Sequence, residues 1–441
     1  MNHMGTVGSA ALPVFRNLAR EARIDRCLAV ALVGYGRRGE ELAHVLTRIP
    51  EVRVTAAADI WPWRLEQARE RLRALGLALR TYGGLDELLA AEGAGVDAVI
   101  VATPDWLHAG QVTACLKAGK HVYCEGELAS SLAKARELVL LAREKKRLVQ
   151  GGHQRRSNPR YIHAFEIVCQ KTKALGRVTH AYAQWHRAAA PFYVVPQRFA
   201  LTTSALEANG YENMEQFLNW EWFRRYGLGS VAALAGQKLD LLRWFWRAEP
   251  VSVTAIGGYD SKGRENADSL MAIFTFVNSE QETVRGYVQI LENVSRGASY
   301  EQFMGENAAL TISEIAICGD AVQPEEERIL KDPVARAALW NPHIYARRIL
   351  PLREPPKSPE EEAANVDVRV TKNVPGWPLP VRLDKPALQP HLENFFAAIR
   401  GETVLSDPAE RAFANLAALD GAVRSAALRC PVDFTPQDFA V

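Results

Sequence analysis

A glycine-rich turn, Gly34-Tyr35-Gly36-Arg37-Arg38-Gly39, sets the strongest limit on the fold of this chain. The apolar run Leu28–Val33 before it is typical of a strand buried on both faces, and the residues after it have helical spacing. In this GxGxxG pattern the first glycine permits a tight turn, the second lets the backbone approach a pyrophosphate, and the third lets helix and strand pack closely. The start of the helix adds free N–H groups and a positive dipole end. The pattern predicts a dinucleotide-binding turn, with a purely structural turn as the alternative.

An acidic residue stands where such a turn needs one. Asp59 lies at the end of the expected strand Val52–Ala58, 20 residues beyond Gly39. Its carboxylate should accept hydrogen bonds from the ribose hydroxyls and repel a 2′-phosphate, which favours NAD over NADP. The opposite preference would follow if Arg37, Arg38 or Arg64 neutralised that phosphate.

Strands alternate with helices up to Gly151, a rhythm that indicates βαβ units and a parallel sheet. The expected strands there are Leu28–Val33, Val52–Ala58, Asp97–Ala102, His121–Cys124 and Leu148–Gly151, and the expected helices are Arg37–Thr47, Trp63–Leu75, Trp106–Ala118 and Ser131–Lys145. After Gly152 we expect a helix, a strand, an aromatic-rich region and then consecutive strands, typical of a largely antiparallel sheet. These segments are Pro159–Gln170, Arg177–His186, Trp185–Trp246 with the helix Ser230–Trp246, and the strands Val251–Gly257, Leu270–Val277, Val284–Leu291 and Ala309–Ile315.

The predicted fold class is therefore α/β. A Rossmann doubly wound parallel sheet is expected over residues 27–151, after an N-terminal arm at 1–26. A C-terminal α/β domain with a largely antiparallel open sheet is expected over 152–441. It includes an irregular Pro-rich excursion at 351–385 and two closing helices near Leu388–Arg400 and Pro408–Leu428.

The composition limits the classes of partner that this chain is expected to bind. The formal net charge of the 441 residues is +2, which gives no electrostatic reason to expect nucleic acid or a membrane surface. No apolar run reaches the roughly 20 residues of a membrane span, and no secretory signal pattern is present. The six cysteines have no CxxC spacing, so we expect reduced thiols in a cytoplasmic protein without a metal site.

Several motifs resemble the Gfo/Idh/MocA oxidoreductases, NAD(P)-dependent enzymes that act mostly on sugars and cyclitols. The resemblance runs over nearly the whole chain after residue 27 and is carried by Gly34–Gly39, Ala102–His108, Ala118–Glu125, Gly152–Arg156, Asn219–Phe223, Asp240–Trp244 and Tyr300–Gly305. It implies that Thr103, Pro104, His108 and Glu125 lie beside the cofactor. It also implies a homo-oligomer, a dimer or tetramer, assembled through the open sheet.

The match breaks at the expected reactive centre. Where the family has Glu-Lys-Pro, this chain has Glu125-Gly126-Glu127. Where the family has Asp-x-Gly-x-His-x-x-Asp, the aligned residues are Ala233, Ala235, Gln237 and Asp240, so only the last aspartate remains. Gln237 can hydrogen-bond a sugar but cannot act as a general base near neutral pH.

Other residues could supply the acid–base chemistry. Lys238 would reach the site only if the helix were rotated, since one residue turns a side chain by about 100°, and a surface lysine is the commoner case. Glu127 could swing in, although a carboxylate there more often caps or faces solvent. The candidate catalytic residues are Lys238, Gln237, His186 and Asp240, with Tyr182 weaker; the candidate substrate-binding residues are Arg155, Arg156, His153, Trp185 and Gln237. For His153 and His186, a structural histidine is the alternative.

Three functions are compatible with this pattern. The first is an NAD-dependent oxidoreductase acting on a hydroxyl or keto group of a sugar, glycoside or cyclitol. The second is a catalytically reduced relative that binds the dinucleotide as a sensor or partner subunit. The third is a glycoside-cleaving enzyme that oxidises transiently with a retained NAD, an analogy of fold alone.

Overall fold

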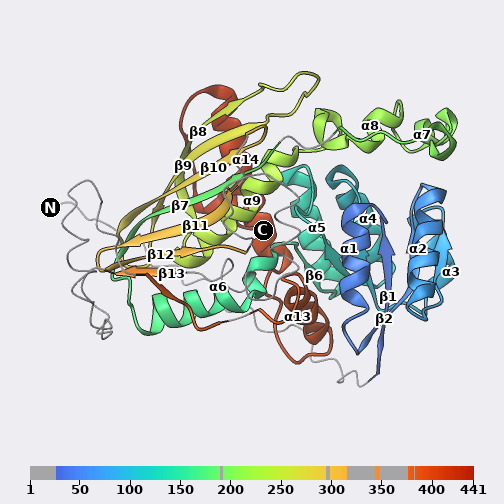
Figure 1. Ribbon diagram of the computed structural model, residues 1–441, viewed down its shortest axis with the longest axis horizontal. Coiled ribbons are helices and arrows are strands. Elements are labelled where there is room, and N and C mark those ends of the chain that lie inside the picture. Colours follow the sequence, from blue (N-terminus) through green and yellow to red (C-terminus); the bar gives the residue numbers. More distant parts are fainter. Residues whose placement is uncertain (1–25, 189–191, 295–297, 315–342, 347–375, 382) are drawn as a thin grey trace, which may run out of the picture.

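The computed structural model describes residues 26–188, 192–294, 298–314, 343–346, 376–381 and 383–441. These residues form two sheets, with most of the helices between or around them (Figure 1). The expected N-terminal arm and most of the expected Pro-rich excursion lie outside the described residues. None of the described helices is long and apolar enough to cross a membrane.

The first sheet has six parallel strands in the order β3-β2-β1-β4-β5-β6. This is the strand order of a Rossmann fold, in which the order reverses next to β1 and leaves a ligand crevice at the carboxyl ends of the strands. Its strands are β1 (Leu28–Val33), β2 (Val52–Ala58), β3 (Arg80–Tyr82), β4 (Ala98–Val101), β5 (His121–Cys124) and β6 (Val149–Gln150). The β1 strand is buried along almost its whole length, as its continuous apolar run predicts.

Five helices connect these strands: α1 (Arg37–Leu46), α2 (Pro62–Ala74), α3 (Leu85–Glu92), α4 (Asp105–Lys117) and α5 (Leu132–Lys145). Their bounds agree with the predicted helices to within two residues, but β3 and α3 were not expected. Both are short, and the β3 strand Arg-Thr-Tyr is neither apolar nor alternating, so periodicity gave no signal for it.

The second sheet is mixed, with the order β14-β13-β12-β11-β7-β10-β9-β8-β15 among the described residues. Every pairing in it is antiparallel except that of β7 with β10, which is parallel. Its strands are β7 (Val178–His186), β8 (Pro250–Gly258), β9 (Ser269–Val277), β10 (Thr283–Leu291), β11 (Ala298–Gly305), β12 (Ala308–Ile312), β13 (His343–Ala346), β14 (Gly376–Pro378) and β15 (Val432–Asp433). The largely antiparallel sheet is confirmed, and β11, β13, β14 and β15 are additions to the predicted strands.

The remaining described helices are short, apart from α9 and the two C-terminal ones. They are a short 3-10 helix (Gln154–Ser157), α6 (Pro159–His163), which continues as a π-helix (Ala164–Lys171), α7 (Thr203–Ala208), α8 (Met214–Leu218), α9 (Ser230–Trp246), α13 (Gln389–Ile399) and α14 (Ala409–Leu428). The prediction for α9 is confirmed residue for residue.

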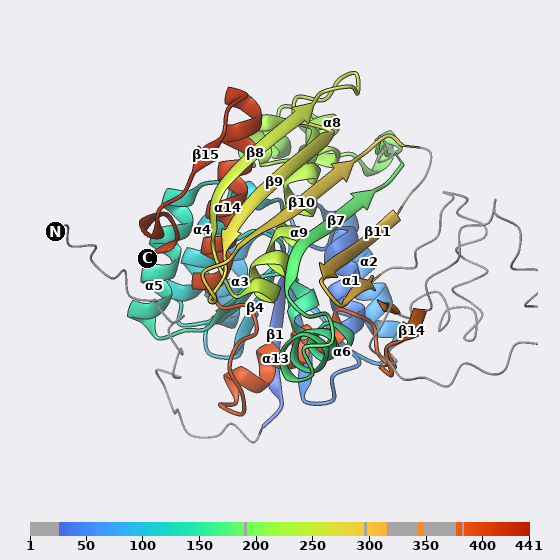
Figure 2. The same cartoon turned by 90° about the vertical axis from the view of Figure 1, so that its left-hand side faces the viewer.

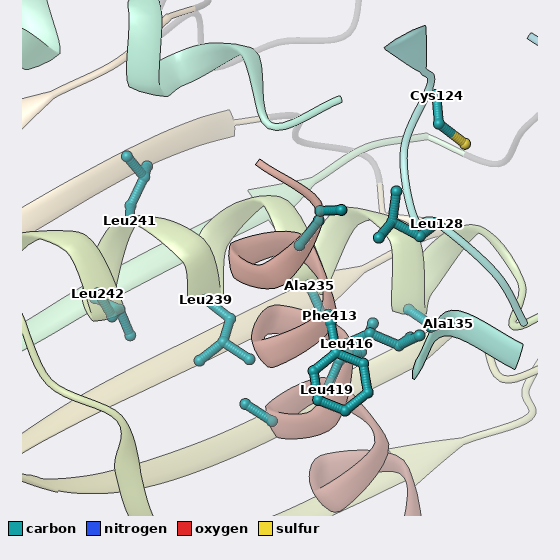
Figure 3. Close-up of a cluster of buried hydrophobic side chains, with 14 of the residues drawn as sticks. Cys124, Leu128, Ala135, Ala235, Leu239, Leu241, Leu242, Phe413, Leu416 and Leu419 are labelled. Carbon is teal, nitrogen blue, oxygen red and sulfur yellow. The ribbon is translucent and has the colours of Figure 1, made fainter. Parts of the chain in front are cut away.

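One face of the second sheet is covered by α9 and α14, which lie behind the strands in Figure 2. Apolar side chains join these helices to the Rossmann sheet. Leu239 of α9, Phe413 and Leu416 of α14, and Leu128 after β5 belong to one buried cluster (Figure 3). The late helix α13 packs instead against β1 and α1 in a second buried cluster. The chain therefore returns to the Rossmann sheet at α13 before it adds the last strand, β15, to the second sheet.

Candidate functional site

The three glycines of the turn differ in what surrounds them. Gly34 has φ +88°, and a Cβ there would stand 2.7 Å from the Ala102 carbonyl oxygen. A Cβ at Gly39 would collide with the Gly34 carbonyl, so helix α1 packs tightly on β1. A Cβ at Gly36, which caps α1, would meet nothing within 4 Å. Backbone atoms close the back of the turn at Gly34 and Gly39, whereas its front, at Gly36, is open. The residues present therefore fit the pyrophosphate of a dinucleotide.

The Asp59 carboxylate is held at the end of β2 by this turn. It accepts hydrogen bonds from the backbone N–H of Tyr35 at 2.6 Å and of Trp61 at 2.8 Å. Burial raises the pKa of Asp59, while these two N–H groups oppose that rise. A carboxylate has about four acceptor positions, so two remain for ribose hydroxyls. Arg64 lies over the Trp61 and Trp63 rings at 5.6 and 5.1 Å, and its charge also acts on Asp59.

The aromatic-rich segment reaches back to the same edge. Phe199 stacks on Trp63 with ring centroids 4.8 Å apart, and its carbonyl accepts the Trp61 indole N–H at 2.6 Å. The Tyr193 hydroxyl lies 3.2 Å from the Arg37 guanidinium. Phe199 and Tyr193 therefore pack against the Rossmann sheet's connections.

Two loops meet beside the carboxyl ends of β4 and β5, and His108 joins them. This buried imidazole places Nδ1 at 2.7 Å from the Glu127 carbonyl and Nε2 at 2.7 Å from the Thr103 carbonyl. Only an imidazolium can donate to both acceptors. Burial opposes that charge, but Cys124, the Glu127 carbonyl and Asp105 raise the pKa of His108 to about 10. Pro104 follows the strand segment and is the N-cap residue of α4, so it also has a structural role.

Hydrogen bonds connect the glycine-rich turn to α9. The Arg38 side chain contacts Glu125 at 3.0 Å and Gln154 Oε1 at 2.9 Å, and Gln154 donates to Glu314 at 3.0 Å. Glu314 in turn contacts the guanidinium of Arg155 at 3.0 Å.

The last links of this chain converge on four residues, Gly126, Gly152, Arg155 and Gln237, which we call the junction site. Arg155 donates to Gln237 Oε1 at 3.2 Å, and Gln237 donates to the Gly152 carbonyl at 3.2 Å. The Gly152 N–H donates to the Gly126 carbonyl at 3.4 Å. The structure thus brings the substituted positions 126 and 237 together with the cofactor-binding turn.

The substituted positions leave open space. Gly126 has φ +67°, a conformation that favours glycine, and a Cβ there would meet nothing within 4 Å. Ala233 is exposed and Gln237 is half-buried on the same face of α9. Positions 126, 233 and 237 therefore all carry uncharged residues.

Lys238 is not the surface lysine that is the commoner case, because it is fully buried. Its ammonium group lies between α9 and the second sheet, where it donates to Ser299 at 2.8 Å and pairs with Glu301. Trp185 covers it, with the ammonium 5.1 Å from the ring centroid, and Arg155 lies over the same ring at 5.1 Å. Burial lowers the pKa of Lys238 to about 8 against the opposing effect of Glu301. One residue of helix rotation separates it from Gln237, and it points into the protein.

His186 is not brought to the junction site. Successive side chains of a strand point to opposite faces, and on β7 Ala183 and Trp185 face α9. His186 lies on the other face with Tyr182, and both contact Gln289, at 3.0 and 2.6 Å respectively. Tyr182 stacks on Tyr287 there. The structure therefore does not bring these two candidate residues to the junction site.

Asp240, Arg156 and His153 form a buried charge network behind the junction site. Arg156 holds Asp240 with both guanidinium arms, at 2.7 to 2.9 Å. His153 donates from Nδ1 to Asp407 at 2.6 Å, and Asn415 contacts its Nε2 at 2.9 Å. Arg156 is thereby committed to Asp240 rather than free for substrate. Oxygen and nitrogen atoms of His153, Asp240 and Asp407 come within 4.8 Å of one another, and Arg156 already balances their charge.

Sequence reasoning missed three buried acids of the site and placed a fourth, Glu127, wrongly. Glu301 and Glu314 were not considered, Asp407 comes from a distant loop, and Glu127 was expected to cap or face solvent but is only 3% exposed. The signal in the sequence was Glu127 itself, a carboxylate where the family pattern has proline.

Comparison with known proteins agrees with this geometry. Residues 28–153 match the Gfo/Idh/MocA model, described as an oxidoreductase family with an NAD-binding Rossmann fold. An inositol 2-dehydrogenase of Saccharopolyspora erythraea is 37% identical over 135 residues, which cover 30% of this chain and 39% of that enzyme. The chain thus spans about two fifths of the length of that curated relative.

Two solved structures share the whole fold. The aldose–aldose oxidoreductase of Caulobacter crescentus, complexed with glycerol, has a TM-score of 0.65 at 18% identity, covering 93% of this chain and all of that one. The dehydrogenase WlbA of Chromobacterium violaceum, in complex with NADH and UDP-GlcNAcA, has a TM-score of 0.60 at 19% identity, covering 94% and 98%. At these identities the likeness concerns the fold alone.

Proposed function

Because residues 28–153 belong to the Gfo/Idh/MocA oxidoreductases, we propose that this protein is an NAD-dependent oxidoreductase acting on a hydroxyl or keto group of a sugar, glycoside or cyclitol. The observation that carries the proposal is the connected path from the glycine-rich turn to Gln237. It joins Arg38, Gln154, Glu314 and Arg155 in one series of contacts. A dinucleotide on the turn would thus share its site with polar groups of the second sheet's helix.

Gly34, Gly36 and Gly39 would hold the pyrophosphate with the N-terminus of α1, and Asp59 the adenosine ribose. Thr103, Pro104, His108 and Glu125 would line the nicotinamide end. Bound there, the cofactor supplies hydride transfer. We favour NAD over NADP because a 2′-phosphate would face the Asp59 carboxylate, although Arg64 lies near enough to weaken that preference.

The junction site suits a polyhydroxylated substrate. Gln237 and Arg155 offer an amide and a guanidinium that can pair with hydroxyl groups. Trp185, half-buried against Arg155 and Lys238, adds an aromatic side chain beside these polar groups. The inositol dehydrogenase among the relatives and the sugar-related neighbours support this substrate class.

The domain organisation, the assembly and the location of the protein are also proposed. We propose two domains, with the boundary near residue 151, and a homo-oligomer through the face of the second sheet that α9 and α14 leave uncovered. That face carries the exposed side chains Ile256, Met271 and Ile273. We also propose a cytoplasmic location, as the scattered spacing of the six cysteines in the sequence suggests.

A second candidate is a dinucleotide-binding relative without turnover. The open space at Gly126 and the exposed Ala233 favour it, because the family's acid–base side chains are missing at both positions. Cofactor binding is common to both candidates, and turnover separates them.

The test begins with binding. The protein is titrated with NADH and NADPH, followed by energy transfer from tryptophan to the nicotinamide. We expect NADH to bind more tightly, and Gly36→Val to abolish binding because its side chain would fill the open front of the turn. Gly84→Val is the matched control: Gly84 also caps a Rossmann helix with nothing within 4 Å of its Cβ, but away from the reversal of strand order.

Turnover is then measured with inositols, aldoses and glycosides plus NAD, and with keto-sugars plus NADH. Reduction of NAD by one of them supports the oxidoreductase. Tight binding with no turnover of any of them supports the second candidate. Failure of the wild type to bind either dinucleotide contradicts both.

A further inference from the structure

Glu127 lies against α9, the helix that carries the substituted positions 233 and 237. It follows Gly126 in the chain, and its carboxylate Oε1 touches α9 at Gly236, the neighbour of Gln237. Leu128, the next residue, packs into the cluster with Ala235 of the same helix (Figure 3). An acidic side chain therefore stands among the sites where relatives carry lysine, aspartate and histidine.

The two oxygens of this carboxylate differ. Oε1 lies 3.5 Å from Nε2 of His153, whose Nδ1 is bound to Asp407. Oε2 is buried and has no hydrogen-bond partner among the described residues. A buried unpaired oxygen costs on the order of 1–3 kcal/mol, so an unsatisfied acceptor here requires a reason.

His153 Nε2 faces two neighbours that favour opposite protonation states. Asn415 donates one amide hydrogen to the Gly236 carbonyl at 3.0 Å and accepts from Arg243 at 3.3 Å, which fixes the orientation of its amide. Its second hydrogen points at Nε2 at 2.9 Å, which requires an unprotonated nitrogen. The ionised Glu127 carboxylate, in contrast, can pair through Oε1 only with a protonated Nε2. A proton can therefore enter or leave this pair with a partner ready in each state.

Burial alone would lower the pKa of His153, but the Asp407 carboxylate outweighs it and raises that pKa well above the ordinary value. Charged groups of several elements face the pair. They are Asp105 and His108 of α4, Arg156 of the 3-10 helix, Asp240 and Arg243 of α9, His391 of α13, Asp407, and Arg411 of α14. Arg156 binds Asp240 and Arg243 binds Glu249, so neither supplies a direct partner to Glu127.

We propose that Glu127, coupled to His153 and Asp407, is the residue that takes the proton from the substrate hydroxyl in place of the missing lysine and histidine. This inference rests on the proposed oxidoreductase function. Oxidation of a carbinol transfers a hydride, with both electrons, to NAD and releases the hydroxyl proton. That proton goes to Oε2 of the ionised Glu127 carboxylate, whose Oε1 pairs with the protonated Nε2 of His153, and it returns from Oε2 to solvent. The hydroxyl or a water would reach Oε2 from the space beside Gly126, where a Cβ would meet nothing within 4 Å.

The first test needs no turnover. Histidines are labelled with ¹⁵N, and the His153 signal is assigned by its absence in His153→Asn. Because a glutamine side chain carries no charge, Glu127→Gln should lower the pKa of His153 by about one pH unit or more, the effect expected of an opposite charge at this range. Glu137→Gln, at an exposed position of α5 away from the pair, is the control and should leave the titration unchanged. An unchanged His153 titration in Glu127→Gln overturns the proposal.

Should Glu127→Gln fail to fold, Glu127→Asp replaces it. This variant withdraws the carboxylate by one methylene and should lower the pKa of His153 in the same direction by less. Here too, an unchanged His153 titration overturns the proposal.

The second test uses the pH dependence of kcat. Glu127→Gln should lower kcat by roughly 10²–10⁴-fold and remove one ionisation from the wild-type profile, with the Kd for NADH unchanged. A Glu127→Gln profile that keeps both the rate and the ionisation overturns the proposal while the oxidoreductase function stands. Absence of turnover in the wild type is a failure of the proposed function, and the histidine titration then decides the coupling alone.

Discussion

Glu127 and Gly236 are sterically matched: a Cβ at Gly236 would overlap the Glu127 carboxylate oxygen. The acid can lie against α9 only because this position of the helix has no side chain. Glu127 follows β5 of the first sheet, whereas Gly236 lies on α9, which covers the second sheet. The two residues are more than 100 positions apart in the chain. Their fit indicates that the glutamate belongs to the packed structure of the interface.

This match predicts the effect of filling the gap. Gly236→Ala should lower the free energy of unfolding by about 1–3 kcal/mol, as expected for overpacking in a close-packed interior. The control Gly110→Ala lies on α4 with nothing within 4 Å of its Cβ, and it should raise stability by about 0.5–1 kcal/mol. In a Glu127→Ala background the penalty of Gly236→Ala should largely disappear, which urea denaturation measures as a double-mutant coupling. Additive effects of the two changes would show that the contact is not made.

The position of Asp59 predicts cofactor preference. Asp59→Asn keeps one oxygen to accept a backbone N–H but removes the negative charge that would repel a 2′-phosphate. The ratio of the NADPH to the NADH dissociation constant should fall at least tenfold, or about 1.4 kcal/mol. Fluorescence titration of both cofactors measures it. A ratio that stays constant would mean that Arg64, rather than Asp59, determines the preference.

The buried Lys238–Glu301 pair predicts a stability effect. Lys238→Met leaves Glu301 buried with only Tyr161 as a partner among the described side chains and should cost about 3–5 kcal/mol of the free energy of unfolding. The double variant Lys238→Met with Glu301→Gln should recover most of this loss. Lys134→Met at an exposed position of α5 should change stability by no more than about 0.5 kcal/mol.

This double variant also tests where the chemistry lies. Lys238 points away from the junction site, so a stable double variant should retain NADH binding and turnover. A folded double variant that binds NADH but has lost turnover would instead make Lys238 the base, as one of the sequence-based candidates has it.

Asp105 predicts a pH dependence of stability. Burial raises its pKa to about 6, its Oδ2 accepts the Leu228 N–H at 3.2 Å, and Oδ1 has no partner among the described residues. Since the folded-state pKa is raised, the stabilisation is full below the unfolded-state pKa of about 4 and is lost as pH rises through 6. Between about pH 4 and pH 7 the wild type should lose about 2–3 kcal/mol relative to Asp105→Asn. Urea unfolding of both proteins at several pH values measures the difference, and parallel curves would contradict it.

Local patterns in the sequence account for nearly all of the Rossmann half. The apolar run of β1, the spacing of Gly34, Gly36 and Gly39, and Asp59 at the end of β2 are patterns of this kind. Each follows from backbone sterics or from burial on both faces of one strand, so a short window of the chain contains the information. The same is true of α9, whose bounds follow from its helical period.

The set of side chains that share the site, in contrast, depends on how distant segments pack. The side chain of His186 lies on the uncovered face of β7. Lys238, one residue after Gln237 on α9, points into the protein toward Glu301. Asp407 reaches His153 across 254 residues of sequence. Pairings of this kind depend on how two sheets and the helices α9, α13 and α14 come together. The local periodicity of the sequence therefore does not predict them. From the sequence, Glu127 is therefore expected to cap a helix or face solvent. In the folded protein it is a buried acid that lies against Gly236.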